Sequence, residues 1–372
     1  TKEGSEFLVN TVTASEQSFP TITALDAGKF VVVWKSIDQD GDSWGIYAQR
    51  YAADGTKEGD EFLVNTHTSS SQSSPFVAHV GSGKFVVTWH SNGQEYFLKG
   101  SGSPHVEFDQ DECEAAATAL GKTYDSGSGS WSFVARGCVE NGFVVYNTHS
   151  SSTAACGASG YKCVESDGTG IYGQRYAADG TKEGSEFHVN THIANTQQES
   201  SVAGLEDGKF VVVWDSYQQD DVSNWNSGIY AQRFKADGTK DDTEFLVNTH
   251  TSKDQRSPSV AYLGSGTFVV AWQSNGQDGS GDGVYARVYN KGAVAVDEFQ
   301  VNEYTTSSQT NPSVAALDAG KFVVAWQSNG QDGSDYGVYS QRYSSGKQPI
   351  AGSMICTQCE ASLIRVGGDL FS

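Results

Sequence analysis

The sequence predicts an all-β fold, a five-bladed β-propeller with four antiparallel strands per blade. Two observations predict it: one sequence unit recurs five times, and no unit shows the apolar periodicity of an amphipathic helix. Four short strands in about 50 residues is the size of a propeller blade. Each unit has a tryptophan at the end of an apolar run, namely Trp34, Trp89, Trp214, Trp272 and Trp326.

The first unit illustrates the strands of a blade. Its expected strands are residues 21–25, 30–34, 45–51 and 61–65. The second of these is apolar on both faces, which is typical of a strand buried on both sides. Asp26-Ala-Gly28 and Ala53-Asp-Gly55 carry turn signals that join consecutive strands.

The two ends of the repeat array predict how the ring closes. Residues 6–10, Glu-Phe-Leu-Val-Asn, match a fourth strand with no blade before them, and the last repeat stops after its third strand near Tyr343. We expect the N-terminal strand to complete the fifth blade, because a closed ring leaves no unpaired edge. The alternative is an open array in a longer parent protein.

The repeat also sets the domain boundaries. Residues 1–96 and 169–347 are assigned to the propeller, 97–168 to an insertion in the second blade, and 348–372 to a linker and tail that could begin another module. Within the insertion we expect a helix over 111–120 and a strand over 143–146.

The six cysteines predict disulfides and an extracellular or cell-surface location. A module as small as the insertion needs covalent cross-links to be stable. Among the three possible pairings of its four cysteines we favour Cys113–Cys138 and Cys156–Cys163. The intervals between these cysteines lack the paired spacing of a zinc site, which makes zinc the weaker alternative. In the tail, Cys356 and Cys359 are expected to form a structural disulfide.

Charge excludes two classes of partner. The formal net charge is −21, from 45 acidic and 24 basic residues, so the chain should repel nucleic acid and anionic membrane surfaces. No apolar run is long enough to insert into a bilayer. The chain begins at Thr1 without a methionine, as expected of a processed chain or a fragment.

Acidic loops between the second and third strands are candidate calcium sites. Alternating aspartates and glycines let oxygen atoms converge on a hard cation, although the same aspartates could cap their own turns. No organic cofactor is predicted. The candidate ligands are Asp38, Asp40, Asp42, Asp278, Asp282, Asp332 and Asp335.

Groups that recur in every blade are expected to serve the blade. This applies to the tryptophans, to the glutamines and to the repeated glutamate and arginine positions, such as Glu61 and Arg50. We expect no blade to carry a unique acidic residue at a position that the others lack, and therefore no catalytic residues.

The repeats resemble a known family. Phe-Val-Val-Ala-Trp-Gln-Ser-Asn-Gly-Gln-Asp-Gly-Ser at 321–333 and Tyr-Gly-Val-Tyr-Ser-Gln-Arg-Tyr at 336–343 are similar to tandem repeats of large secreted surface proteins. Those proteins often also carry hemolysin-type calcium-binding or cadherin-like modules. The resemblance implies an extracellular β-propeller used in adhesion or cell-surface assembly, with no known enzyme activity. The insertion resembles small cysteine modules of secreted algal and protist proteins.

Three functions remain as hypotheses. The first is a non-enzymatic adhesion propeller that binds other protein chains, either copies of itself or neighbouring surface modules; the insertion favours it, because it breaks the symmetry at one blade. The second is a lectin with sites between blades, whose aromatic residues would be Trp44, Trp225 and Tyr336. The third is a glycoside hydrolase, since five-bladed propellers also host enzymes with two or three unlike carboxylates at one mouth.

Overall fold

The computed structural model describes residues 3–92, 97–99, 137–140, 144–147, 162–165, 169–193, 195–220 and 225–345. The chain divides into two compact units, Thr1–Pro258 and Ser259–Ser372. The described residues are all-β and form antiparallel sheets with short 3₁₀ turns and no α-helix. None of these elements is a helix long and apolar enough to cross a membrane.

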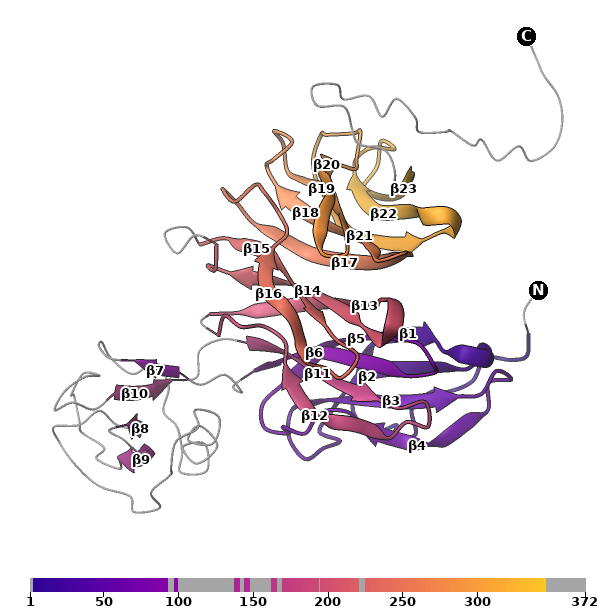
Figure 1. The fold of residues 1–372 in the computed structure, drawn as a ribbon, viewed down its shortest axis with the longest axis vertical. Helices are drawn as coiled ribbons and strands as arrows, with labels where there is room; N and C mark the ends of the chain where they lie inside the picture. The colour runs from indigo at the N-terminus through magenta and orange to yellow at the C-terminus, as the bar shows by residue number, and fades with distance from the viewer. Residues whose placement is uncertain are drawn as a thin grey trace, which may run out of the picture. The chain divides into compact units, whose positions relative to one another are not determined.

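The first unit contains three four-stranded sheets of the repeat. Their inner strands, β1, β5 and β13, lie side by side (Figure 1). The strands are, from inside to outside, β1 (Gln17–Ala24), β2 (Phe30–Ile37), β3 (Trp44–Tyr51) and β4 (Lys57–Leu63); β5 (Gln72–His79), β6 (Phe85–Asn92), β11 (Thr169–Tyr176) and β12 (Lys182–His188); and β13 (Gln197–Gly204), β14 (Phe210–Tyr217), β15 (Ser227–Phe234) and β16 (Lys240–Leu246).

The remaining two sheets continue the repeat. One has the order β17-β18-β19-β20, and its inner strand β17 begins in the first unit; the other has three strands. The strands are β17 (Gln255–Gly264), β18 (Thr267–Asn275), β19 (Asp282–Asn290), β20 (Ala293–Gln300), β21 (Gln309–Ala316), β22 (Lys321–Asn329) and β23 (Tyr336–Ser344). The prediction of five blade-like sheets is confirmed. The prediction of a strand at residues 6–10 is not, because no ladder includes them.

The insertion forms a small sheet of its own. Its order is β7-β10-β8-β9, from β7 (Phe97–Lys99), β8 (Gly137–Glu140), β9 (Val144–Asn147) and β10 (Lys162–Glu165). Strand β9 confirms the strand expected near 143–146. The expected helix at 111–120 lies outside the described residues, as do the side chains of all six cysteines.

Apolar residues of the second strands pack between neighbouring sheets. In the first unit, Val31 and Val33 of one blade pack against Phe85 and Trp89 of the next. Every blade tryptophan is at most 6% exposed, so the repeated tryptophan is a core residue. Fully burying a large apolar side chain contributes about 1.5–3 kcal/mol, so each interface between blades is a substantial part of the stability.

The repeated asparagine and glutamine form a buried polar network at the start of each inner strand. Asn65 Oδ1 accepts the Ile46 amide at 2.7 Å. Its Nδ2 donates to His67 O at 2.8 Å and to Gln72 Oε1 at 3.3 Å. The same bonds recur at Asn190, Asn248 and Asn302. These groups serve the blade, as predicted, because they satisfy buried polar atoms where the chain passes to the next sheet.

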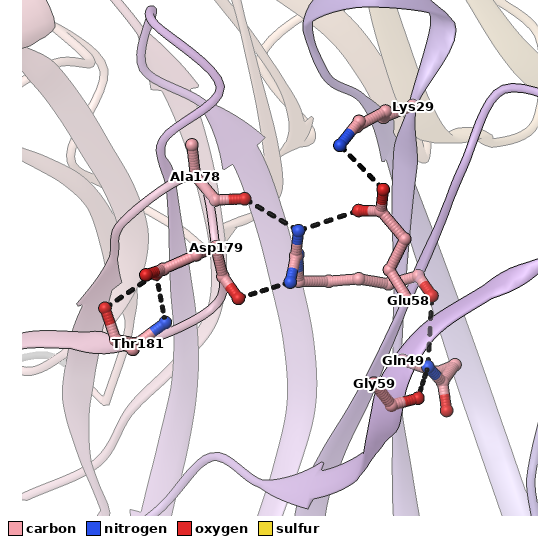
Figure 2. Close-up of polar contacts among 8 residues, drawn as sticks. Lys29, Gln49, Glu58, Gly59, Ala178, Asp179 and Thr181 are labelled. Atoms are coloured by element: carbon pink, nitrogen blue, oxygen red, sulfur yellow. Dashed lines mark hydrogen bonds and ion pairs between the residues drawn. The ribbon is translucent and has the colours of Figure 1, made fainter.

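The repeated arginine connects neighbouring blades. The Arg50 guanidinium donates to the backbone carbonyls of Ala178 and Asp179, in the hairpin turn of the next blade, and binds Glu58 of its own blade at 2.7 Å (Figure 2). Arg175 repeats the contact with Ala236 O at 2.7 Å. This confirms that the arginines bind backbone and strand partners.

We expect Arg50→Met to destabilise the protein by about 2–4 kcal/mol. The side chain is 8% exposed, and its loss leaves two turn carbonyls without their charged donor. Lys29→Met is the matched control, because Lys29 binds the same Glu58 at 2.6 Å but is 42% exposed. It should cost at most about 1 kcal/mol. Urea unfolding of both variants measures the difference, and equal losses would contradict the role assigned to Arg50.

Candidate functional site

A β-bulge interrupts the inner strands β1, β5, β13 and β21 near their starts. In the first three sheets the register shifts between Ser18 and Thr21, between Ser73 and Phe76, and between Gln198 and Ser201. One residue of each bulge has a positive φ, namely Phe19 at 55°, Ser74 at 48° and Glu199 at 51°. In each of these sheets, the second strand carries a residue directly after the blade tryptophan. This residue pairs with the inner-strand residue that precedes the bulge. In the three sheets it is Lys35, His90 and Asp215. We call these six residues the bulge site.

The bulge site is where the repeat varies. Each second strand keeps a Trp-x-Ser sequence, and x is Lys35, His90, Asp215, Gln273 and Gln327 in the five blades. The bulge residue varies as well: Phe19, Ser74, Glu199, Ser257 and Asn311. The core residues recur in every blade, whereas these two positions change in almost every blade. This contrast indicates that the two positions form a functional surface. The variation at the Trp-x-Ser position is visible in the sequence, whereas its proximity to the bulge residues is not.

The third blade places acidic groups at both variable positions. Glu199 is exposed and accepts a hydrogen bond from Ser257 Oγ at 2.9 Å. Asp215 is 1% exposed, and among the residues that the structure describes neither of its oxygens has a hydrogen-bond partner of normal geometry. The prediction that no blade carries a unique acidic residue is therefore wrong.

Burial controls the charge of Asp215. Desolvation raises the pKa of its carboxyl well above the usual value, and the nearby Glu199 carboxylate raises it further. Arg256 and Gln198 oppose the shift. A buried carboxyl with a raised pKa therefore lies near an exposed acidic side chain.

Asp254 and Arg256 border this acidic pair. Asp254 accepts the Ser227 amide at 3.0 Å and the Arg256 guanidinium at 3.0 Å. Asp254 is thereby held by two donors, which leaves Glu199 as the exposed acidic group of the bulge site.

The first two blades contribute basic groups instead. The Lys35 ammonium lies 4.5 Å from the ring centre of Phe19 and 4.0 Å from that of Trp44. Burial, and then the charge of Lys35, lower the pKa of His90 to about 4. His90 is therefore uncharged at neutral pH, and its buried Nδ1 has no hydrogen-bond partner among the described residues.

His90 should make stability depend on pH. Its pKa in the folded protein, about 4, lies below the value of 6.5 expected in the unfolded chain, so the unfolded state takes up a proton first. Stability is fully present above pH 6.5 and should fall by up to about 1.4 kcal/mol per pH unit towards pH 4. Thermal melts of the wild type and of His90→Gln across this window measure the effect. A variant that loses stability with the same slope would contradict it.

In the first blade the three predicted calcium ligands differ in their burial and in their hydrogen-bond partners. Asp42 accepts the amides of Ser43 and Ser70, at 2.8 and 3.1 Å, so it joins two loops. Asp38 is exposed, and its amide closes the turn onto Ser43 O at 2.7 Å. Both carboxylate oxygens of Asp40 are buried and have no hydrogen-bond partner in the described part of the chain; they fill the space that a side chain at Gly45 would need.

In the second unit, Asp278 and Asp332 take the position that Asp40 has in the first. Each lies against a glycine, Gly283 or Gly337, and caps its own turn through the amide of Ser280 or Ser334. Asp282 accepts from Asn275, and Asp335 closes its turn through its backbone carbonyl. Across the described residues no three His, Cys, Asp or Glu side chains group to hold a metal ion. Calcium binding stays a prediction.

The aromatic residues proposed for a lectin fall in different surroundings. Trp44 is half-buried against Lys35, whereas Trp225 is 75% exposed and packs against Tyr217 at 6.3 Å between ring centres. Tyr336, in the second unit, is 59% exposed.

Comparisons with known proteins bear on the fold. No protein-family model and no curated protein sequence matches the chain. Among solved structures, it is similar to an α-L-arabinanase of Penicillium chrysogenum complexed with arabinobiose, with 13% identity, coverage of 91% of this chain and 80% of that chain, and a TM-score of 0.49. It is also similar to an α-L-arabinofuranosidase of Fusarium graminearum, with 11% identity, coverage of 92% of this chain and 87% of that chain, and a TM-score of 0.47. A third similar structure is a protein of unknown function from Dyadobacter fermentans, with 10% identity, coverage of 88% of this chain and 79% of that chain, and a TM-score of 0.48.

These matches correct two predictions made from the sequence. Several of the similar structures are glycoside hydrolases, which contradicts the adhesion role and the absence of enzyme activity. At such low identity the likeness concerns the fold alone.

Proposed function

We propose that the protein is a glycoside hydrolase whose active site is the bulge site. Asp215 supplies the proton for the departing sugar oxygen, and Glu199 is the ionised carboxylate that faces the glycan. The observation that carries the proposal is the raised pKa of buried Asp215 beside an exposed Glu199. Glycosidic bond cleavage uses such a pair, one carboxyl protonated and the other ionised.

The surroundings of the pair are consistent with these roles. The two carboxyl groups interact, because the nearby Glu199 charge adds to the effect of burial in raising the pKa of Asp215. Gln198 lies beside Asp215 and opposes part of the pKa shift. Phe19 is 59% exposed and supplies an apolar ring against which a sugar can pack.

The test is a hydrolysis screen with the whole chain. Nitrophenyl glycosides of common pentoses and hexoses, and reducing-end release from plant and algal polysaccharides, cover the main substrate classes. Hydrolysis that disappears in Glu199→Gln supports the proposal. Glycan binding without any hydrolysis would overturn it in favour of a lectin.

We also propose that the N-terminal segment completes the fifth blade. The Phe7 and Tyr51 rings lie 5.3 Å apart and tilted by 47°. The fourth strand of the first blade makes the same contact with the second, between Phe62 and Tyr176, at 5.3 Å and 49°. Residues 6–10 therefore already make the contacts of a fourth strand with the blade that follows it.

Hydrogen bonds at the same segment point the same way. Tyr51 Oη donates to Val9 O at 3.2 Å, and Asn10 Nδ2 donates to Val12 O at 2.6 Å and Gln17 Oε1 at 3.3 Å. Only the partner strand is missing from this pattern. In the second unit the sheet β21-β22-β23 has three strands, and Val338 of β23 is 80% exposed. We propose that Val338 donates its amide to Asn10 Oδ1, as Ile46 does to Asn65.

A glycan-cleaving enzyme of this kind is proposed to act outside the cell. The even number of cysteines, four of them within the insertion, favours an oxidising compartment. Mass spectrometry of the unreduced chain tests this, since free thiols would contradict it.

A further inference from the structure

The first blade contributes a cationic group to the bulge site that the proposed chemistry does not use. Lys35 follows Trp34 in β2 and holds the position that Asp215 holds in the third blade. Its ammonium is flanked by two aromatic rings, at 4.5 Å from the centre of Phe19 and 4.0 Å from that of Trp44. The rings shield the ammonium from water on two sides, which strengthens its interaction with any anion that arrives.

Lys35 has no acidic partner among the described residues. Three other lysines do have one: Lys29 binds Glu58, Lys84 binds Glu183 and Lys209 binds Asp241, at 2.6, 2.6 and 3.3 Å. The chain has 45 acidic and 24 basic residues, so carboxylates are in excess over the cationic groups that could pair with them. An unpaired ammonium at a candidate site therefore leaves room for a negative charge supplied by a ligand.

The groups around Lys35 indicate which ligand. Phe19 holds a positive φ of 55° and is 59% exposed, a costly placement for a bulky aromatic side chain. An exposed ring of this kind packs well against the apolar face of a sugar. His90 is uncharged at neutral pH, so it adds no second positive charge beside the Lys35 ammonium.

We infer that Lys35, Phe19, Trp44 and His90 form a subsite for a sugar unit that carries a carboxylate, a uronic acid. The ammonium binds the carboxylate, and the rings pack against the pyranose. The inference rests on the proposed function for its place in an enzyme, and it names the substrate class: acidic polysaccharides rather than neutral ones.

Binding, measured without turnover, tests the subsite. The protein is the full chain carrying Glu199→Gln, and the probes are methyl glucuronide and methyl galacturonide beside methyl glucoside and methyl galactoside. Each pair differs only at C6. Ligand-observed NMR at constant ionic strength should show at least tenfold tighter binding of one uronide than of its neutral partner. Equal binding of both members in each pair overturns the inference.

Substitutions at Lys35 assign the effect to its charge. Lys35→Met keeps the aliphatic stem and should remove the tenfold preference, while Lys35→Arg should retain it. Lys29→Met, a charge removal away from the site, should change nothing. A preference that survives in Lys35→Met overturns the assignment.

A sulfated probe separates the two sources of negative charge. Methyl glucoside 6-sulfate that binds while both uronides fail would overturn the carboxylate assignment. Because these measurements need no catalysis, a uronide preference in a protein without hydrolytic activity would refute the proposed enzyme and leave the subsite in place.

Discussion

Glu199→Gln and Asp215→Asn should each lower kcat by about 10²–10⁴-fold, the range expected for losing a carboxyl that transfers or balances a proton. Both replacements are nearly the same size as the original side chains. Glu199 is exposed, so its amide is tolerated. Asp215 is buried with a raised pKa, so a neutral amide should suit its environment at neutral pH at least as well as the acid does.

The pH profile separates a catalytic role from a structural one. Activity requires the protonated form of Asp215, so the wild-type rate should fall as pH rises through its raised pKa. Stability should fall in the same direction, because the folded state binds this proton more tightly than the unfolded chain does. Asp215→Asn should lose both dependences. If the variant keeps its rate while only its stability changes, Asp215 is a structural residue.

Deleting residues 1–10 should lower Tm by about 10 °C. The deletion removes Phe7, Leu8 and Val9, each expected to contribute about 1.5–3 kcal/mol once the strand is paired. In the unpaired state Phe7 and Leu8 are 51% and 63% exposed, and their loss would then cost little. A large fall in Tm therefore reports that the strand is paired in solution.

Two controls make this result specific. Deleting residues 1–4 leaves the Glu-Phe-Leu-Val-Asn strand intact and should leave Tm unchanged. Hydrogen exchange should find the Val338 amide protected in the full chain and exchanging freely after deletion of residues 1–10. A protected Val338 in a dimer, seen by light scattering, would show that the strand comes from a second copy and would contradict closure within one chain.

The blades could be predicted from the sequence because their signals are local. Phe30 to Trp34 is apolar at every position, and Asp54-Gly55 marks a tight turn, so strand and hairpin follow from neighbouring residues. Five copies of the same pattern then determine five sheets of the same kind. The structural role of Arg50 also follows from recurrence, since a group required in nearly every blade serves what the blades share.

The sequence shows that the residue after each blade tryptophan varies, but not that it lies opposite a bulge. Phe19, Lys35, Glu199 and Asp215 are far apart in sequence and differ in chemistry, and what they share is a position relative to the bulge. Asp215 looks like a surface residue in sequence, yet it is 1% exposed, and only burial beside Glu199 makes it an acid. The sequence by itself determined the repeated strands, because strand and turn propensity are local. The tertiary structure alone decided which carboxyl has a raised pKa, because desolvation depends on what packs around it.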